Sequence, residues 1–396
     1  MTSLRAGGRP PLAPPRDLTI ADDGSTTTYT VLSRALGRAI SEAQSILHER
    51  VGDEIGSDLA ALAASVRRPE IGVLVRAHRS ATPEARAALA TELAATIAFD
   101  HACARALAAP IRVERPPRRI LSSAAGVAID VPEDAQAMTF AADRITIDRA
   151  SGRDEIDLDA PVDQIKAARL VFHEVDRDVL FATEDNNPLA MIEAHPDKSG
   201  NAIDLGGESV EGWLAALREA IEIVRAELPS FGAEIALLRP TIIPVGADAE
   251  RHLSASYREA LGTVYLSLHP SVMTMAEAIV HELSHAKLNA LFEVDDVLEN
   301  AFSPLYASPV RPDPRPLHGV LLAVHAFLPI ARMYEKMIES KHALAESPAF
   351  RARYEEIVRI NREGAEVVLA NGKPTAVGRG LLDEIARWDE HYRRAG

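Results

Sequence analysis

The chain has 396 residues, of which 47% are hydrophobic and 26% are charged, and its formal net charge is −15. A chain of this length and composition is expected to fold into about two or three domains with a sizeable core. The acidic balance argues against a nucleic-acid partner, because the sequence has no excess of Lys and Arg to bind phosphates.

Redox and targeting features point to the cytoplasm. Cys103 is the only cysteine, so no intrachain disulfide is possible, and its alanine neighbours predict a small core residue. No apolar run of about 18 residues occurs, which predicts no membrane span. Residues 1–26 are Pro-rich and lack the apolar core of a secretory signal, so they are predicted to be a disordered lead-in. We therefore expect a soluble cytoplasmic protein.

Two segments of different secondary structure follow. Residues 27–109 predict helices, because apolar side chains recur with a period near 3.6 and a Thr-Pro pair begins a new helix after a break at Ser80–Pro83. Their Ala-rich sequence favours a packing role over a platform for a partner. Residues 110–205 predict short antiparallel strands, with Asp, Gly and Pro between them. His173 and Glu174 are adjacent in one such strand and are interpreted as structural or surface residues.

Residues 206–396 begin with an amphipathic helix, for which Ser209 is the predicted N-cap and Pro229 the end. Residues 234–247 and 261–270 are predicted strands, and the second leads directly into an apolar helix. The remaining predicted segments are an irregular Pro-rich stretch at 302–316 and helices at 318–340, 347–370 and 378–393.

The apolar helix carries the motif His281-Glu282-Leu283-Ser284-His285. Histidines four residues apart lie on one helical face, where both imidazoles can bind one transition-metal ion, with Glu282 beside the open coordination position. The structural alternative is a solvated amphipathic helix that happens to carry two histidines. It is disfavoured by the apolar residues around the motif, Ile279, Val280, Leu283 and Leu288.

A strand followed at once by a HExxH helix is the order found in zincin-type folds. The predicted fold class is therefore α+β, with a zincin-like metal-binding helix pair, an antiparallel sheet and an N-terminal helical region, and residues 206–396 form the predicted catalytic region. In such folds the edge strand runs along the cleft and can bind an extended peptide by strand addition. We expect the strand around Tyr265–Leu268 to take that position.

A catalytic metal needs three protein ligands and an open position. His318 is the favoured third ligand, because it begins an apolar helix and Gly319 beside it leaves room for close approach. Glu299 is the second choice, by analogy with the gluzincin proteases, whose third ligand is a glutamate on a following helix. Asp313 and His325 are further candidates, and His325 shares a helical face with His318, which suits a supporting or substrate-facing role.

The Pro-rich segment places Arg311 and Arg315 just before the favoured third ligand. A guanidinium on a chain stiffened by prolines is suited to binding a carboxylate through two parallel hydrogen bonds. The alternative is that both arginines are loop charges paired with Asp295, Asp296 or Asp313. The sequence is compatible with either interpretation.

The motif HELSHAKL, followed by SPVRPDPRPLHGVLLAVHAF, resembles the HExxH-motif peptide-modification proteins encoded beside ribosomally made, post-translationally modified peptides. The specific resemblance covers roughly residues 262–335, and this combination is more specific than HExxH alone. Members of that family are described as iron- and 2-oxoglutarate-dependent peptide β-hydroxylases on a zincin-like helix pair. Val310 departs from the family pattern, in which an aromatic residue often precedes the arginine, and this affects the expected packing of the loop.

The resemblance implies that His281, His285 and His318 hold Fe(II). It also implies that Arg315, or as second choice Arg311, binds the distal carboxylate of 2-oxoglutarate, whose keto acid end would chelate the iron. The implied reaction is hydroxylation at Cβ of residues in a ribosomally made precursor peptide, with the metal and the co-substrate supplying the oxidation.

The competing hypotheses assign different roles to Glu282. In the peptide hydroxylase it is not needed as a base and would orient an iron-bound water or the substrate. In the alternative, a zinc-dependent metallopeptidase, it is the general base that activates a metal-bound water. A third hypothesis, a leader- or partner-binding protein with a structural zinc, is disfavoured because such sites use mostly thiolates and Cys103 is the only one in the sequence.

Overall fold

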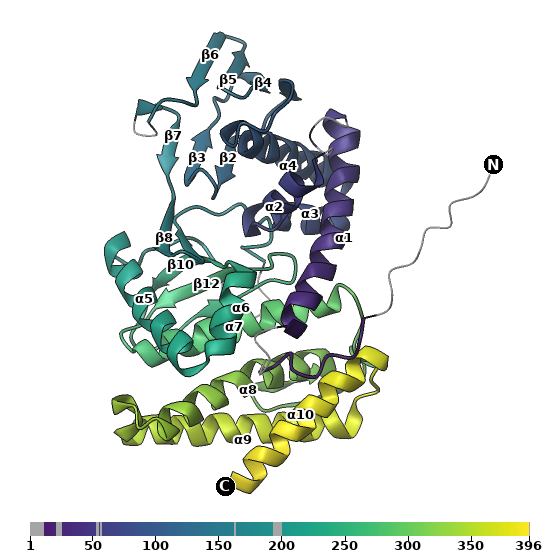
Figure 1. Ribbon diagram of the computed structural model, residues 1–396, viewed down its shortest axis with the longest axis vertical. Helices are drawn as coiled ribbons and strands as arrows, with labels where there is room; N and C mark the ends of the chain where they lie inside the picture. The colour runs from purple at the N-terminus through teal and green to yellow at the C-terminus, as the bar shows by residue number, and fades with distance from the viewer. Residues whose placement is uncertain are drawn as a thin grey trace, which may run out of the picture. The chain divides into compact units, whose positions relative to one another are not determined.

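The computed structural model describes residues 12–20, 26–52, 55, 58–161, 164–192 and 200–395. The chain forms two compact units, and Figure 1 labels most of its helices and strands. The larger unit is Leu32–Ala286, and the smaller unit combines Met1–Val31 with Lys287–Gly396. Because the boundary falls within helix α7 (Val272–Phe292), the HExxH motif belongs to the larger unit and His318 to the smaller one.

The described part of the chain confirms the helical prediction for residues 27–109. The helices are α1 (Thr26–Val51), α2 (Leu59–Val66), α3 (Pro69–Ser80) and α4 (Pro83–Cys103). The predicted break lies where α4 begins, because Thr82 Oγ1 accepts a hydrogen bond from Ala85 N at 3.4 Å and Pro83 occupies the first turn, where its missing amide hydrogen costs nothing.

Short antiparallel strands follow, as predicted for residues 110–205. They are β1 (Ile111–Glu114), β2 (Arg119–Ser122), β3 (Val127–Asp130), β4 (Ala135–Phe140), β5 (Arg144–Arg149), β6 (Gly152–Asp157) and β7 (Ala168–Leu170). One antiparallel sheet has the order β1-β4-β5-β6 and another the order β2-β3-β7. Their apolar faces, with Ile129 and Phe140, pack in one core with residues of α3 and α4 such as Val75 and Phe99.

The central element of the larger unit is a five-stranded sheet in the order β11-β12-β10-β9-β8. Its strands and associated helices are β8 (Phe172–Asp176), β9 (Val179–Ala182), α5 (Val210–Glu227), α6 (Pro229–Leu238), β10 (Thr241–Ala247), β11 (Ser254–Ala255) and β12 (Thr263–Leu268). Strand β10 is parallel to both β9 and β12, whereas the remaining pairs are antiparallel. The sheet is therefore mixed, which corrects the prediction of an antiparallel one.

Two further predictions in this region need correction. Residues 234–238 are the end of helix α6 and not strand, because Pro229 starts that helix and Arg239 ends it in a left-handed conformation with φ of 47°. The expected edge strand at Tyr265–Leu268 is an inner strand, because β11 pairs with its outer side. The prediction of Ser209 as N-cap is confirmed, since its hydroxyl accepts a hydrogen bond from Gly212 N at 3.0 Å.

The two faces of the five-stranded sheet contact different partners. Ile242 and Val264 surround a narrow apolar gap together with residues of α5, α6 and α7. Their chain neighbours point the other way, as the strand period of two requires. On that other face Ile243 and Tyr265 pack with apolar residues of β2 and β3. Helix α7 therefore packs against the sheet through its own apolar face.

The smaller unit contains β13 (Leu305–Ser308), β14 (Arg311–Pro316), α8 (Leu317–Glu339), a short 3-10 helix (Ala343–Glu346), α9 (Pro348–Asn371) and α10 (Ala376–Ala395). Residues 302–316 were predicted to be irregular, but β13 and β14 form an antiparallel hairpin within them. The three C-terminal helices are confirmed, and α8, α9 and α10 pack against one another (Figure 1). Gly364 permits close packing of α8 on α9, because a Cβ there would lie 2.5 Å from Val324.

The smaller unit also includes part of the predicted lead-in. Leu18 and Thr19 are fully buried, and their amides donate to the Glu384 carboxylate of α10 at 2.9 and 3.0 Å. Lys287 Nζ donates to Thr19 O at 3.1 Å. Residues 1–11 and 21–25 of the lead-in lie outside the described residues.

Helix α8 is long and apolar enough to cross a membrane by length and composition. Its most apolar stretch is 72% buried, as is common for the core helix of a compact fold.

Candidate functional site

Helix α7 positions the two histidines of the motif. Ile279 and Leu283 face the five-stranded sheet, and a rotation of about 100° per residue turns His281 and His285 to the opposite side of the helix. Both histidines are half-buried, and their ring centroids lie 4.4 Å apart in an edge-to-face arrangement. The structure thus brings two imidazoles together on one face.

Glu282 points to a third direction, toward the edge strand β11. Its side chain is buried, and both of its carboxylate oxygens accept hydrogen bonds from serine hydroxyls. Ser254 Oγ donates to Oε1 and Ser256 Oγ donates to Oε2, each at 2.6 Å. The carboxylate is therefore held at both ends by the same short segment.

The register of β11 explains why both hydroxyls reach this carboxylate. Ser254 pairs with Leu266 in antiparallel register, so the two side chains point to the same face of the sheet. Val264 also points to that face and packs against α7. Because side chains alternate along an extended chain, Ser256 faces α7 like Ser254.

The β11 segment is anchored on both sides of the serines. Leu253 N donates to Ser267 Oγ, and Ser267 N donates to Leu253 O, each at 2.8 Å. After the serines, Tyr257 Oη donates to Ala190 O at 3.0 Å, and Asn201 Nδ2 donates to Tyr257 Oη at 2.6 Å. These bonds keep the serine hydroxyls in place, so the position of Glu282 is fixed by its surroundings.

Burial alone would raise the pKa of the Glu282 carboxyl. The positive charges of His281 and His285 and the hydrogen bonds from Ser254 and Ser256 together outweigh this effect of burial. The pKa of Glu282 therefore lies below its usual range, and the side chain is ionised at neutral pH. An ionised carboxylate that already accepts two hydroxyl hydrogen bonds has reduced capacity to take a proton from water.

The two imidazoles fit adjacent ligand positions of a transition metal, since both lie on one helical face. No group of three or more His, Cys, Asp or Glu side chains placed to hold a metal ion occurs in the part of the chain that the structure describes. A catalytic metal takes three protein ligands. The third, predicted to be His318, therefore stays a prediction.

His318 begins helix α8 in the smaller unit. Its backbone N donates to Ala301 O at 2.9 Å. The imidazole is half-buried and packs against two phenylalanine rings, with centroid distances of 4.4 Å to Phe292 and 5.2 Å to Phe302. These rings restrict the orientation of the imidazole, as a ligand position requires.

The other candidates for the third ligand have different surroundings. Glu299 lies in a turn, where its backbone N donates to Lys373 O at 2.8 Å, so it does not lie on a following helix as the gluzincin analogy expects. His325 is fully buried within α8, which leaves no surface for a substrate-facing role. Asp313 lies exposed in the hairpin between Arg311 and Arg315.

The arginines of the hairpin both lie near Asp313. Arg311 Nε is 3.3 Å from Asp313 Oδ1, and Arg315 Nε is 3.6 Å from Asp313 Oδ2. This agrees with the alternative that the arginines pair with a loop aspartate. Alternation along β14 explains the grouping, because residues 311, 313 and 315 share one face of the strand. Asp313 is 55% exposed, so the pairs are largely hydrated and weak.

Arg315 also extends along the start of α8. A Cβ at Gly319 would lie 3.7 Å from Arg315 Cδ and 3.8 Å from one of its terminal nitrogens. The guanidinium thus lies beside the residue that follows His318. Arg315 therefore lies next to Gly319, and its role as the carboxylate-binding arginine stays a prediction.

No protein-family model matches the chain, and no curated protein is similar to it.

Sequence reasoning missed the two serines that bind Glu282. The signal is weak: Ser254 and Ser256 have the alternating spacing of a strand face, but only one residue separates them and the strand is two residues long. Their partner is Glu282, more than twenty residues further along the chain, so no local pattern connects them. Only the pairing of β11 with β12 brings them to α7.

Proposed function

We propose that the protein is a cytoplasmic iron- and 2-oxoglutarate-dependent hydroxylase that acts at Cβ of residues in a ribosomally made precursor peptide. The observation that best supports oxidation over hydrolysis is the environment of Glu282. Both of its oxygens accept hydroxyl hydrogen bonds at 2.6 Å, whereas a metallopeptidase needs this carboxylate free to take a proton from a metal-bound water.

His281 and His285 would supply two imidazole ligands to Fe(II), with His318 as the predicted third. When bound, iron and 2-oxoglutarate would supply the oxidising chemistry, and the protein would position the substrate Cβ and exclude water. The role of Glu282 would then be electrostatic: a fixed, ionised carboxylate next to the imidazoles favours a cation there. Ser254 and Ser256 would keep it in that orientation.

Arg315 would bind the distal carboxylate of 2-oxoglutarate, with Arg311 as the second choice. A guanidinium binds a carboxylate through two parallel hydrogen bonds. In the structure both arginines lie near the exposed Asp313, and such a hydrated pair contributes at most about 1 kcal/mol. A dicarboxylic acid can therefore displace Asp313 at little cost.

The test is an anaerobic titration of the iron-loaded protein with 2-oxoglutarate, followed by the charge-transfer absorption band of the keto acid on iron. We expect a saturable band, and succinate once air and the encoded precursor peptide are added. Arg315→Ala should weaken 2-oxoglutarate binding about tenfold or more, because a charge-assisted pair is lost. Arg118→Ala is the control, since Arg118 is an exposed arginine on the larger unit. Peptide cleavage with zinc, without succinate, would instead support the metallopeptidase.

A further inference from the structure

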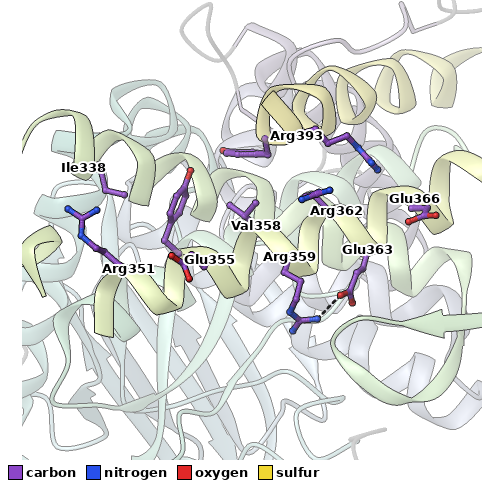
Figure 2. A pocket seen from close by; sticks show the side chains of 11 residues that line it. Ile338, Arg351, Glu355, Val358, Arg359, Arg362, Glu363, Glu366 and Arg393 are labelled. Atoms are coloured by element: carbon purple, nitrogen blue, oxygen red, sulfur yellow. Dashed lines mark hydrogen bonds and ion pairs between the residues drawn. The ribbon is translucent and has the colours of Figure 1, made fainter. Parts of the chain in front are cut away.

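A groove of about 630 Å³ lies in the smaller unit, along one side of α9. Figure 2 shows its lining, with Arg351 and Glu355 toward one end and Glu366 and Arg393 toward the other. Ile338 comes from α8 and Arg393 from α10, so all three C-terminal helices contribute. The groove contains none of the residues of the candidate metal site.

The groove is long enough for an extended peptide. Its lining runs along α9 from Arg351 to Glu366, which is about 22 Å at the helical rise of about 1.5 Å per residue. An extended peptide of about seven residues has this length. Apolar and aromatic side chains lie between the charges, namely Ile338, Tyr354, Val358 and Tyr392.

Four arginines line the groove, and two of them already have carboxylate partners. Arg359 pairs with Glu363 at 2.8 Å, and Arg393 pairs with Asp389 at 2.7 Å. The guanidiniums of Arg351 and Arg362 have no hydrogen-bond or ion-pair partner among the residues that the structure describes, and both residues are exposed. In a chain with a net charge of −15, such guanidiniums are local sites for an external carboxylate.

Tyr392 adds an unsatisfied donor to the same groove. Its side chain is 1% exposed, and its hydroxyl has no hydrogen-bond partner within the described part of the chain. Buried tyrosine hydroxyls normally have one. Burial raises the pKa of this phenol well above its ordinary value, and nearby Glu335 and Tyr354 raise it further, so the hydroxyl keeps its proton. The group is therefore suited to donate to a ligand oxygen.

We propose that this groove binds an acidic segment of the peptide substrate in extended form, with Arg351 and Arg362 each binding a carboxylate and Tyr392 donating a hydrogen bond to the peptide. The inference rests on the proposed peptide-modifying function. Arg351 and Arg362 lie about 16 Å apart along α9, the length of about five residues of extended chain. Because neighbouring side chains of an extended peptide point to opposite sides, two acids can face the groove together only at an even spacing, such as four positions. Glu355 and Glu366 also line the groove and repel acidic residues of the peptide that lie beside them. The spacing of the peptide's acidic residues, which must reach Arg351 and Arg362, therefore matters more than their number.

The first experiment measures binding by fluorescence anisotropy without iron or 2-oxoglutarate. The probe is a fluorescein-labelled, twelve-residue Gly/Ser/Ala peptide with two glutamates four positions apart. We expect it to bind at least about tenfold more tightly than the same peptide with glutamines. A peptide of identical composition with adjacent glutamates should also bind more weakly. Equal binding of all three peptides, or displacement of the probe by an equal concentration of inorganic phosphate, would overturn the inference.

Variants of the protein locate the binding to this groove. Arg351→Gln and Arg362→Gln should each weaken binding of the glutamate probe about tenfold or more, whereas Tyr392→Phe should weaken it about fivefold, as expected for a neutral hydrogen bond. The matched control is Arg379→Gln, an exposed arginine on α10 outside the groove, which should leave binding unchanged. An equal loss in Arg379→Gln would overturn the assignment.

Turnover of the encoded precursor peptide separates this inference from the proposed function. If the protein hydroxylates its peptide but the glutamate probe does not bind, the groove assignment fails and the proposed function stands. If the probe binds and no peptide is oxidised, the proposed function fails and the groove still binds acidic peptide. If both hold, Arg362→Gln should raise KM for the precursor with little change in kcat.

Discussion

Two buried glutamates, one in each unit, have opposite electrostatic environments. Glu282 of α7 is 3% exposed and Glu384 of α10 is fully buried, and each accepts several hydrogen bonds from nearby residues. Burial raises the pKa of Glu384 to about 7, whereas the pKa of Glu282 lies below its usual range. Their hydrogen bonds alone do not explain this difference.

The difference comes from charge. Hydrogen bonds from Thr19, Ile20 and Leu18 lower the pKa of Glu384, yet burial prevails, because no cation is among the causes of its shift. At Glu282 the charges of His281 and His285 add to the hydrogen bonds from Ser254 and Ser256, and together they prevail over burial. Glu384 thus keeps its proton up to about neutral pH, whereas Glu282 is an anion beside two imidazoles.

The largest expected effect comes from removing an imidazole. His281→Ala or His285→Ala should lower Fe(II) affinity and the rate of peptide oxidation by more than about a hundredfold. Mutating a residue that only hydrogen-bonds to a metal ligand already lowers metal affinity by up to about a hundredfold, and loss of a ligand itself should lower it more. Metal content after dialysis and initial rates of succinate formation measure this. The control is His48→Ala, at an exposed histidine of α1. Equal effects of the control and test variants would mean that His281 and His285 do not bind the metal.

Removing the two serine hydroxyls that donate to Glu282 should have the next largest effect, a loss of stability. In Ser254→Ala/Ser256→Ala the buried carboxylate loses two hydrogen bonds, each worth about 1.5–3 kcal/mol for a charged acceptor, so the free energy of unfolding should fall by about 3 kcal/mol or more. Urea unfolding at pH 7 measures it. Ser41→Ala, at an exposed serine of α1, is the control and should change little. An unchanged stability of the double variant would mean that the hydroxyls do not fix Glu282.

Glu384 should give the protein a characteristic pH dependence. Its pKa is about 7 in the folded chain against 4.5 ordinarily, so its contribution to stability is fully present below pH 4.5 and is lost as pH rises through 7. The loss amounts to at most about 3 kcal/mol. Urea unfolding at several pH values gives the free energy of unfolding of the parent and of Glu384→Gln. The two free energies should converge as pH rises.

The exposed neighbour Asp383→Asn serves as the control for Glu384→Gln. Its free energy of unfolding should change with pH in the same way as that of the parent. A constant difference between the parent and Glu384→Gln from pH 5 to 8 would show that the two buried glutamates do not differ in the way described.

The smallest effect concerns the hairpin of the smaller unit. Asp313→Asn should tighten 2-oxoglutarate binding by up to about fivefold, because it removes an exposed competitor for the guanidiniums worth at most about 1 kcal/mol. Binding is measured by the charge-transfer band under anaerobic conditions. Weaker binding in Asp313→Asn would mean that the aspartate orients the arginines for the ligand rather than competing with it.

Local patterns predicted much of the fold and the pairing of two imidazoles on one helical face. Apolar periodicity and caps such as Ser209 located most of the helices, and the four-residue spacing located the imidazole pair. The predictions failed where long-range pairing decides the structure. The parallel pairing of β10 with β12 and the edge position of β11 are not encoded in any local window, so Ser254 and Ser256 were missed.

The hairpin at 302–316 was missed for a related reason. Proline usually argues against strands, but within the described part of the chain no further strand pairs with this hairpin, so its prolines interrupt no larger ladder. Arg351 and Arg362 were overlooked because alternating charges on a helix ordinarily indicate a solvated face. Only the packing of α8 and α10 against α9 turns that face into a groove.

The central claim is tested most directly by incubating the iron-loaded protein, 2-oxoglutarate and the encoded precursor peptide under ¹⁸O₂, with intact-mass analysis of the peptide and of succinate. The account predicts an uncut peptide carrying one ¹⁸O atom at a Cβ and succinate carrying the other. A peptide split into two fragments with solvent oxygen at the new carboxylate, and no labelled succinate, would contradict it.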